Sequence, residues 1–265
     1  MDFSLSEWLN LLFRWTHVFA GIMWVGTTYY FTWLDRQLRA AEAGGAQVWM
    51  VHSGAFYTVQ KQKSLGVPAD QLHWFRWEAA ATWASGVALL TVVYYAGGAL
   101  LDSPDGTISG WLAIAIGVGA IVGGWIVYDL LVRSPLGRSS VFPLVGFVLI
   151  VAAAAGLRLV FSGRATYIHI GAIFGTIMAV NVWERILPAQ RRMIAAAARG
   201  DAIDPALGTG AKLRSKHNTF LAVPVVFIMI SNHFPIATYG NRYGILVLGA
   251  MVLAGWAAAA WLRRA

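Results

Sequence analysis

The sequence contains no cysteine and few charged residues, and both shortages narrow what the chain can be. Without cysteine, the 265 residues cannot form a disulfide, a thiolate metal site, an iron–sulfur cluster or a covalently attached c-type haem. Charged residues make up only 12% of the chain and hydrophobic residues 58%, so charges are too few to solvate a globular surface of this size. The apolar surface is therefore predicted to face lipid.

Long apolar runs separated by short charged stretches predict an all-α fold, a polytopic transmembrane bundle of about seven helical spans. The runs cover residues 8–34, 79–101, 108–131, 140–162, 165–187, 218–236 and 243–262. We expect a single transmembrane domain, residues 1–265, with long connections at 35–78 and 188–217. The second connection begins with a basic, helix-forming stretch, which predicts an amphipathic helix on the lipid headgroups.

Lysine and arginine concentrate in alternate connections. The connections after the first, third and fifth spans carry five, two and seven basic residues, whereas the other three carry none, one and one. By the positive-inside rule the basic connections are cytoplasmic, which places the N-terminus outside and the C-terminus in the cytoplasm. The same topology explains the net charge of +8 without a nucleic-acid partner. We expect a multi-pass protein of the bacterial inner membrane.

The third span carries small residues at near four-residue intervals, namely Gly117, Gly119, Gly123 and Gly124. Small residues on a membrane helix let a neighbouring helix approach closely. We therefore interpret these glycines as helix-packing positions and not as a nucleotide-binding loop.

The six histidines divide into two groups by predicted depth. The outer halves of spans hold His17, His169 and His233, and the cytoplasmic connections hold His52, His73 and His217. With ~1.5 Å of rise per residue, His17 and His169 would lie about 14 Å and about 6 Å below the outer boundary, close enough for one planar ligand to bridge them. Neutral imidazole is a good ligand of haem iron, and bundle cores commonly hold cofactors.

We predict a haem b whose iron is bound by His17 and His169, with His233 as a competing ligand. Span one favours this, because His17, Gly21 and Trp24 share one helical face and a flat ring could rest against the glycine. The alternative is that each histidine only forms a hydrogen bond between helices.

A second group of candidate functional residues lies at the cytoplasmic start of span two, in LHWFRWEAAATW. His73, Arg76 and Trp77 recur at helical spacing, and Glu78 follows. Such a set could orient a planar anion by pairing with Arg76 and stacking on Trp74 or Trp77. The alternative is an aromatic belt with a local pair between Arg76 and Glu78.

Polar residues elsewhere in the spans are predicted to need partners. Asn181 and Glu184 lie near the cytoplasmic end of span five and need polar neighbours, whereas Arg185 is expected to snorkel to the interface. Asp35 and Asp129 are interpreted as interfacial residues and not as parts of a proton path.

Four segments carry a family resemblance, THVFAGIMWVGTTYYFTWLD (16–35), LHWFRWEAAATW (72–83), residues 163–191 and residues 214–235. They resemble the membrane-bound urate oxidase (urate hydroxylase) family, also called the urate oxidase N-terminal domain family. The resemblance implies oxidation of urate to 5-hydroxyisourate, with electrons passed to cytochrome c. Members typically end in a fused cytochrome c domain. Because this chain has no Cys-x-x-Cys-His, we expect it to use a separate acceptor.

The resemblance and the residues together give one leading hypothesis, a membrane oxidoreductase that oxidises urate with the help of haem b. The pattern at His17 also resembles haem-binding bacterial protoporphyrinogen oxidases of the membrane. Urate would bind on the cytoplasmic side, with Arg76 pairing to the anion and His73 and Glu78 as catalytic candidates. His52 and His217 are expected either to complete this pocket or to bind a second haem.

Two other functions compete with this hypothesis. The first is a haem-binding protein of membrane electron transfer or assembly without urate activity. The second is a transporter or channel, which a helix-breaking Pro224 in span six and polar residues within the spans would suit.

Overall fold

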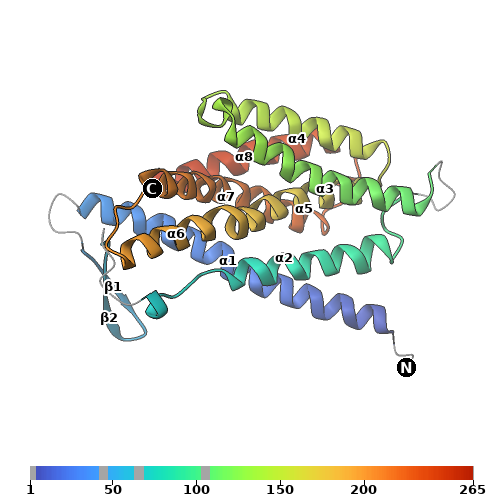
Figure 1. Cartoon of the computed structure of the whole chain (residues 1–265). Helices are drawn as coiled ribbons and strands as arrows, with labels where there is room; N and C mark the ends of the chain where they lie inside the picture. Colours follow the sequence, from blue (N-terminus) through green and yellow to red (C-terminus); the bar gives the residue numbers. More distant parts are fainter. Residues whose placement is uncertain (1–3, 42–46, 63–68, 103–107, 265) are drawn as a thin grey trace.

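The computed structural model describes residues 4–41, 47–62, 69–102 and 108–264, and most of them are helical (Figure 1). The helices are α1 (Leu5–Ala41), α2 (Trp77–Leu90), α3 (Gly110–Arg133), α4 (Phe142–Arg158), α5 (Gly163–Val180), α6 (Leu187–Ala198), α7 (Pro205–Ser231) and α8 (Gly244–Arg264). Two π-helical turns, η2 (Thr91–Tyr95) and η4 (Asn181–Ile186), extend α2 and α5. The strands are β1 (Gln47–His52) and β2 (Ala55–Gln60).

Several helices present apolar side chains outward, as a lipid environment requires. In the described part of the chain, three helical stretches are long and apolar enough to cross a membrane, Gly110–Arg133, Gly163–Ala198 and Gly244–Arg264. On α1, a stripe of large exposed apolar side chains consists of Leu11, Trp15, Phe19 and Ile22. A continuous exposed apolar stripe of this kind is rare on soluble monomers, so both features indicate association with a membrane.

The C-terminal ends of α1 and α8 lie side by side. Arg36, near the end of α1, donates a hydrogen bond of 2.6 Å from Nη1 to the carbonyl oxygen of Arg264. The N-terminal end of α1 therefore lies at the opposite end of the bundle from the C-terminal end of α8 (Figure 1). A chain that crosses the membrane an odd number of times has its two ends on opposite sides, as found here for the start of α1 and the end of α8.

The connection at 35–78 contains a β-hairpin, so the expectation of an all-α chain is wrong in this region. Strands β1 and β2 pair antiparallel from Gln47 opposite Gln60 to His52 opposite Ala55. Both turn residues, Ser53 and Gly54, have positive φ, as a tight two-residue hairpin turn requires. Residues 42–46 and 63–68 of this connection lie outside the described residues.

The hairpin is tied to α1 through Asp35. This carboxylate accepts a hydrogen bond from Lys61, just after β2, and lies 3.6 Å from Arg39 Nε. Partial burial by itself would raise the pKa of Asp35, but Lys61, Lys212 and Arg39 together hold it below its ordinary value. The carboxylate therefore stays charged, and it joins α1, the hairpin and α7.

The connection at 188–217 is also largely helical. Its predicted amphipathic helix is confirmed as α6, which begins at Leu187. Helix α7 begins at Pro205, well before the apolar run that starts at residue 218. Asp204 caps α7 by accepting a hydrogen bond of 2.8 Å from the amide of Ala206, and proline is well tolerated in the first turn.

Close helix packing depends on some of the glycines and not on others. A Cβ at Gly124 would lie 2.7 Å from Ile173 Cγ2 of α5, whereas a Cβ at Gly119 or Gly123 would meet no atom within 4 Å. The packing interpretation is thus confirmed for Gly124 but not for these two neighbours. In the same way, a Cβ at Gly255 of α8 would lie 2.8 Å from Cδ of Pro224 in α7.

Replacing Gly255 by alanine should destabilise the protein, because the Pro224 ring is rigid and cannot move away alone. We expect Gly255→Ala to lower the free energy of unfolding by about 1–3 kcal/mol, the usual range for overpacking. Gly119→Ala is the control and should be neutral or slightly stabilising, since alanine favours the helix. Thermal unfolding in detergent measures both, and equal stabilities would contradict the assigned contact.

Candidate functional site

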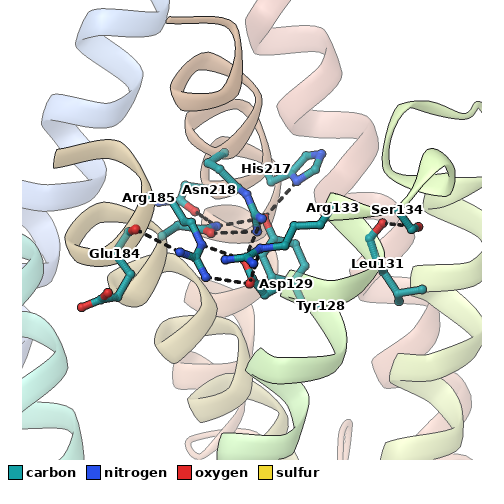
Figure 2. A network of polar contacts seen from close by, with 11 residues as sticks. Tyr128, Asp129, Leu131, Arg133, Ser134, Glu184, Arg185, His217 and Asn218 are labelled. Carbon is teal, nitrogen blue, oxygen red and sulfur yellow. Dashed lines mark hydrogen bonds and ion pairs between the residues drawn. The ribbon is translucent and has the colours of Figure 1, made fainter. Parts of the chain in front are cut away.

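A buried carboxylate on α3 binds arginines from three segments (Figure 2). Asp129 accepts hydrogen bonds of 2.9 and 2.7 Å from Nε and Nη2 of Arg185 in η4, and one of 2.7 Å from Nη2 of Arg214 in α7. Arg133, one turn further along α3, lies 2.9 Å away. Asp129 and Arg185 therefore neutralise each other within the protein, and their interfacial and snorkelling positions relative to the membrane stay predictions.

Amide and hydroxyl groups extend this cluster toward His217. Arg214 Nη1 donates to Asn181 Oδ1 at 3.3 Å, and Asn181 Nδ2 donates to Asn218 Oδ1 at 3.0 Å and to the Tyr128 hydroxyl at 2.9 Å. The Tyr128 hydroxyl lies 2.9 Å from Nδ1 of His217. The prediction that Asn181 needs polar neighbours is confirmed. We call Tyr128, Asp129, Asn181, Arg185, Arg214, His217 and Asn218 the Asp129 network.

On the other side of η4, Arg76 lies among tryptophans. Its Cζ is 5.2 Å from the ring centroid of Trp77 and 6.0 Å from that of Trp74. Trp77 in turn meets Trp183 of η4 edge-on, with ring centroids 5.9 Å apart. The structure therefore assembles the cation and the two stacking residues that the sequence predicts, and it adds Trp183.

The backbone at this site differs from the predicted helix. Helix α2 begins only at Trp77, and Arg76 is its N-cap, with φ −133° and ψ −28°. The assumption that His73 and Arg76 share a helical face is therefore wrong, because the chain before Trp77 is not helical. His73 is exposed and packs edge-on against Phe75 at 4.6 Å between centroids.

Arg76 has an unsatisfied donor. Its Nε is buried and has no hydrogen-bond partner, and no ion pair to Glu78 is present among the described residues. A local pair between Arg76 and Glu78, the alternative interpretation of this motif, is thus not found. Buried polar groups are nearly always satisfied, so the unpaired guanidinium N–H makes Arg76 a candidate ligand-binding residue.

The remaining predicted substrate residues do not join Arg76. His52 ends β1 and is exposed on the hairpin, and His217 belongs to the Asp129 network. Glu78 lies in the first turn of α2 with a half-buried side chain.

His17 has the geometry of an iron ligand. Its Nδ1 lies 2.9 Å from the carbonyl oxygen of Thr82 in α2. Because a carbonyl only accepts, Nδ1 carries the proton and Nε2 keeps a lone pair, the arrangement in which histidines usually bind metals. Gly86 leaves room for the ring, since a Cβ there would lie 3.0 Å from His17 Cε1. The same face of α1 packs against α2, where Gly21 lies opposite Thr82.

His169 is anchored in the same way but is not open to a ligand. It is fully buried, its Nδ1 donates to the carbonyl of Ala165 at 2.8 Å, and its Nε2 lies 3.1 Å from the Tyr95 hydroxyl. A Cβ at Gly117 would lie 2.7 Å from the same Nε2, so this glycine makes room for the ring. Tyr95 would have to turn away before an iron could reach His169.

The predicted haem ligands do not touch one another in this structure. No hydrogen bond or ring contact joins His17 to His169 in the residues described, and His233 is exposed beyond the end of α7. Within those residues, no group of three or more His, Asp or Glu side chains could hold a metal ion. Of the three predicted ligands, His17 is the residue whose hydrogen bonds leave Nε2 able to hold a haem iron.

The Asp129 network is the part of the site that the sequence interpretation missed. The available signal was a carboxylate inside an apolar run, because a charge there needs a partner inside the protein. The partner, Arg214, is distant in the sequence and lies in the predicted connection at 188–217.

Removing the Asp129 charge should destabilise the bundle strongly, because the buried Arg214 guanidinium would lose its counter-charge. We expect Asp129→Asn to cost about 3–5 kcal/mol of unfolding free energy. The control is Asp102→Asn, which breaks an exposed pair with Arg158 and should cost ~0–1 kcal/mol. Denaturant unfolding in detergent compares the two, and similar losses would count against a structural role for the network.

Comparison with protein families finds a family model that matches nearly the whole chain. Residues 3–265 match the family described as Urate oxidase N-terminal. Searches of curated proteins and of solved structures find no match. Since the match covers nearly every residue, the chain belongs to the urate oxidase N-terminal family.

Proposed function

We propose that this protein is a membrane urate oxidase that converts urate to 5-hydroxyisourate. The observation that carries the proposal is the family match over residues 3–265. In the reaction urate gains a hydroxyl group from water and releases two electrons, one to each of two acceptor molecules, and two protons to the solvent. The acceptor we propose is a cytochrome c, as the family resemblance implies.

Urate fits the site around Arg76 in charge and in shape. At neutral pH urate is mostly a planar monoanion, and Arg76 offers a buried Nε–H without a partner. Trp74 and Trp77 provide aromatic faces next to this guanidinium. A cation beside two aromatic faces favours a flat anion over a flexible or neutral molecule. The acid–base roles of His73 and Glu78 stay predictions.

The topology we propose has seven spans with the N-terminus outside and the C-terminus in the cytoplasm of a bacterium. It is supported by the basic residues in alternate connections and by the contact between the ends of α1 and α8. In this orientation the Arg76 site lies toward the cytoplasm, on the same side as the hairpin.

We further propose that the bundle binds haem b through His17. The group would supply one-electron transfer between urate and the acceptor. The protein's own part is to fix the ring of His17 through Thr82 and to keep Nε2 unprotonated. His169 stays a predicted second ligand, which needs a displacement of Tyr95.

A urate assay with a matched arginine variant tests the activity. Membranes containing the protein, incubated with urate and oxidised cytochrome c, should consume urate and reduce the cytochrome in a fixed ratio without forming peroxide. In Arg76→Gln we expect KM for urate to rise by about 10–100-fold, the value of a lost charged hydrogen bond. Arg192→Gln, which removes an exposed charge on α6, should leave KM unchanged.

Two results would contradict these assignments. An unchanged KM in Arg76→Gln would place urate elsewhere. A protein that holds haem but consumes no urate would instead be an electron-transfer or assembly protein.

The haem assignment has its own spectroscopic test. Purified His17→Ala should lose or shift the Soret band, because the iron loses an axial nitrogen ligand. Thr16→Ala on the neighbouring, partly buried position of α1 is the control and should keep the band, because the Thr16 hydroxyl bonds only to the carbonyl of Leu12. A spectrum that is the same in both variants would rule out His17 as a ligand.

A further inference from the structure

A large cavity lies between α3, α4, α5, α7 and α8, away from the Arg76 site. Its volume is about 910 Å³, and its walls are mostly apolar. Polar side chains are present in one region of the lining, contributed by Tyr128, Arg138, Ser139, Lys216 and His217. A ligand of this cavity therefore needs a long or broad apolar body and a small polar head.

The hydrogen bonds of the Asp129 network fix the protonation of His217. A guanidinium only donates, so Arg214 requires Asn181 Oδ1 as its acceptor, and Asn181 Nδ2 must then donate to the Tyr128 oxygen. Among the described residues the Tyr128 hydroxyl has no other acceptor than Nδ1 of His217 at 2.9 Å, so we infer that its proton is donated there. The neutral imidazole therefore carries its proton on Nε2.

This Nε2–H is a hydrogen-bond donor available to a ligand. No hydrogen bond to Nε2 of His217 is found among the described residues. The ring is held flat against Phe142, with centroids 5.1 Å apart and planes 11° from parallel. His217 thus presents a fixed N–H group in the lining of an apolar cavity, and Ser139 adds a hydroxyl there.

We propose that this cavity binds a membrane quinone. A quinone head is planar, carries carbonyl oxygens that accept from Nε2–H and from a hydroxyl, and can stack on aromatic rings such as Phe142. Its isoprenoid tail matches the apolar walls. A haem iron suits His217 less well, because the protonated Nε2 has no lone pair for it.

The quinone would be a second, membrane-resident electron acceptor that the protein can use in place of cytochrome c, an inference that rests on the proposed urate oxidation. Urate and water give 5-hydroxyisourate, two protons and two electrons. The quinone takes up both electrons and two protons, and each of its carbonyl groups becomes a hydroxyl group, so the reaction balances as urate, water and quinone to 5-hydroxyisourate and quinol.

Two glycines allow a matched test of the cavity. Gly146 lines the cavity and Gly119 does not, and a Cβ at either position meets no atom within 4 Å. Gly146→Leu therefore fills the cavity without a clash at Cβ, while Gly119→Leu adds the same side chain to an exposed position of α3. Both changes replace a glycine within a helix and should not lower helix stability.

The probe is a photoreactive azido-ubiquinone with a short tail, added without urate to purified protein in phosphatidylcholine nanodiscs. We expect saturable labelling of peptides from α4 and α7 in the wild type and in Gly119→Leu. Gly146→Leu should raise the half-saturating concentration by about tenfold or more, because leucine occupies the space of the ring. His217→Phe should raise it about fivefold, the value of one hydrogen bond, and His217→Gln should restore part of the loss.

Three outcomes would overturn the proposal. They are labelling that does not saturate, equal half-saturation in Gly146→Leu and Gly119→Leu, and displacement of the probe when phosphatidylglycerol is added to the nanodiscs, which would show a lipid groove. Because binding is measured without urate, a protein that binds quinone but fails to oxidise urate would contradict only the proposed activity. A wild-type protein that oxidises urate but shows no saturable quinone binding would contradict only the quinone site.

Discussion

The buried carboxylate of Asp129 is the interaction on which the rest of this bundle depends. A charge in a low-dielectric interior is tolerated only when it is paired and hydrogen-bonded, and Asp129 meets this condition through Arg185 and Arg214. These partners come from η4 and α7, so one side chain of α3 fixes the relative position of three segments. Bonds that start from Arg214 pass through Asn181 and set the hydrogen on His217. The ion pair thereby influences the protonation of His217, which is not itself part of the pair.

The π-helical turn η4 joins this cluster to the tryptophan site. Residues of one short segment face in two directions, with Asn181 and Arg185 toward α3 and α7 and Trp183 toward Trp77 of α2. An extra residue in a helical turn changes which side chains share a face, and such turns occur often at functional sites. Because both groups depend on η4, a shift of this turn would move the cation site and the polar network together. The segment is also part of the longest motif of the family resemblance.

The histidines illustrate how the same side chain takes different chemical states in one protein. His17 and His169 both donate from Nδ1 to a backbone carbonyl, which leaves Nε2 as an acceptor, but only His169 has that acceptor occupied, by Tyr95. In His217 we infer the reverse direction, with Nδ1 accepting from the Tyr128 hydroxyl 2.9 Å away. Predicted depth in the membrane separates the histidines into an outer and an inner group, and hydrogen-bond partners then distinguish those whose Nε2 is an acceptor from the one whose Nε2 we infer to be a donor.

The sequence alone determined the largely helical, membrane-associated class, the family and the association of Arg76 with Trp74 and Trp77. These follow from local properties, namely the length of apolar runs, the placement of charge and short motifs whose residues are close in the chain. The hairpin at Gln47–Gln60 was missed because it is hidden in a connection and depends on pairing across its own turn. The partners of Asp129, the start of α2 and the protonation of His217 were decided only by the tertiary structure, because each depends on atoms from segments far apart in the sequence.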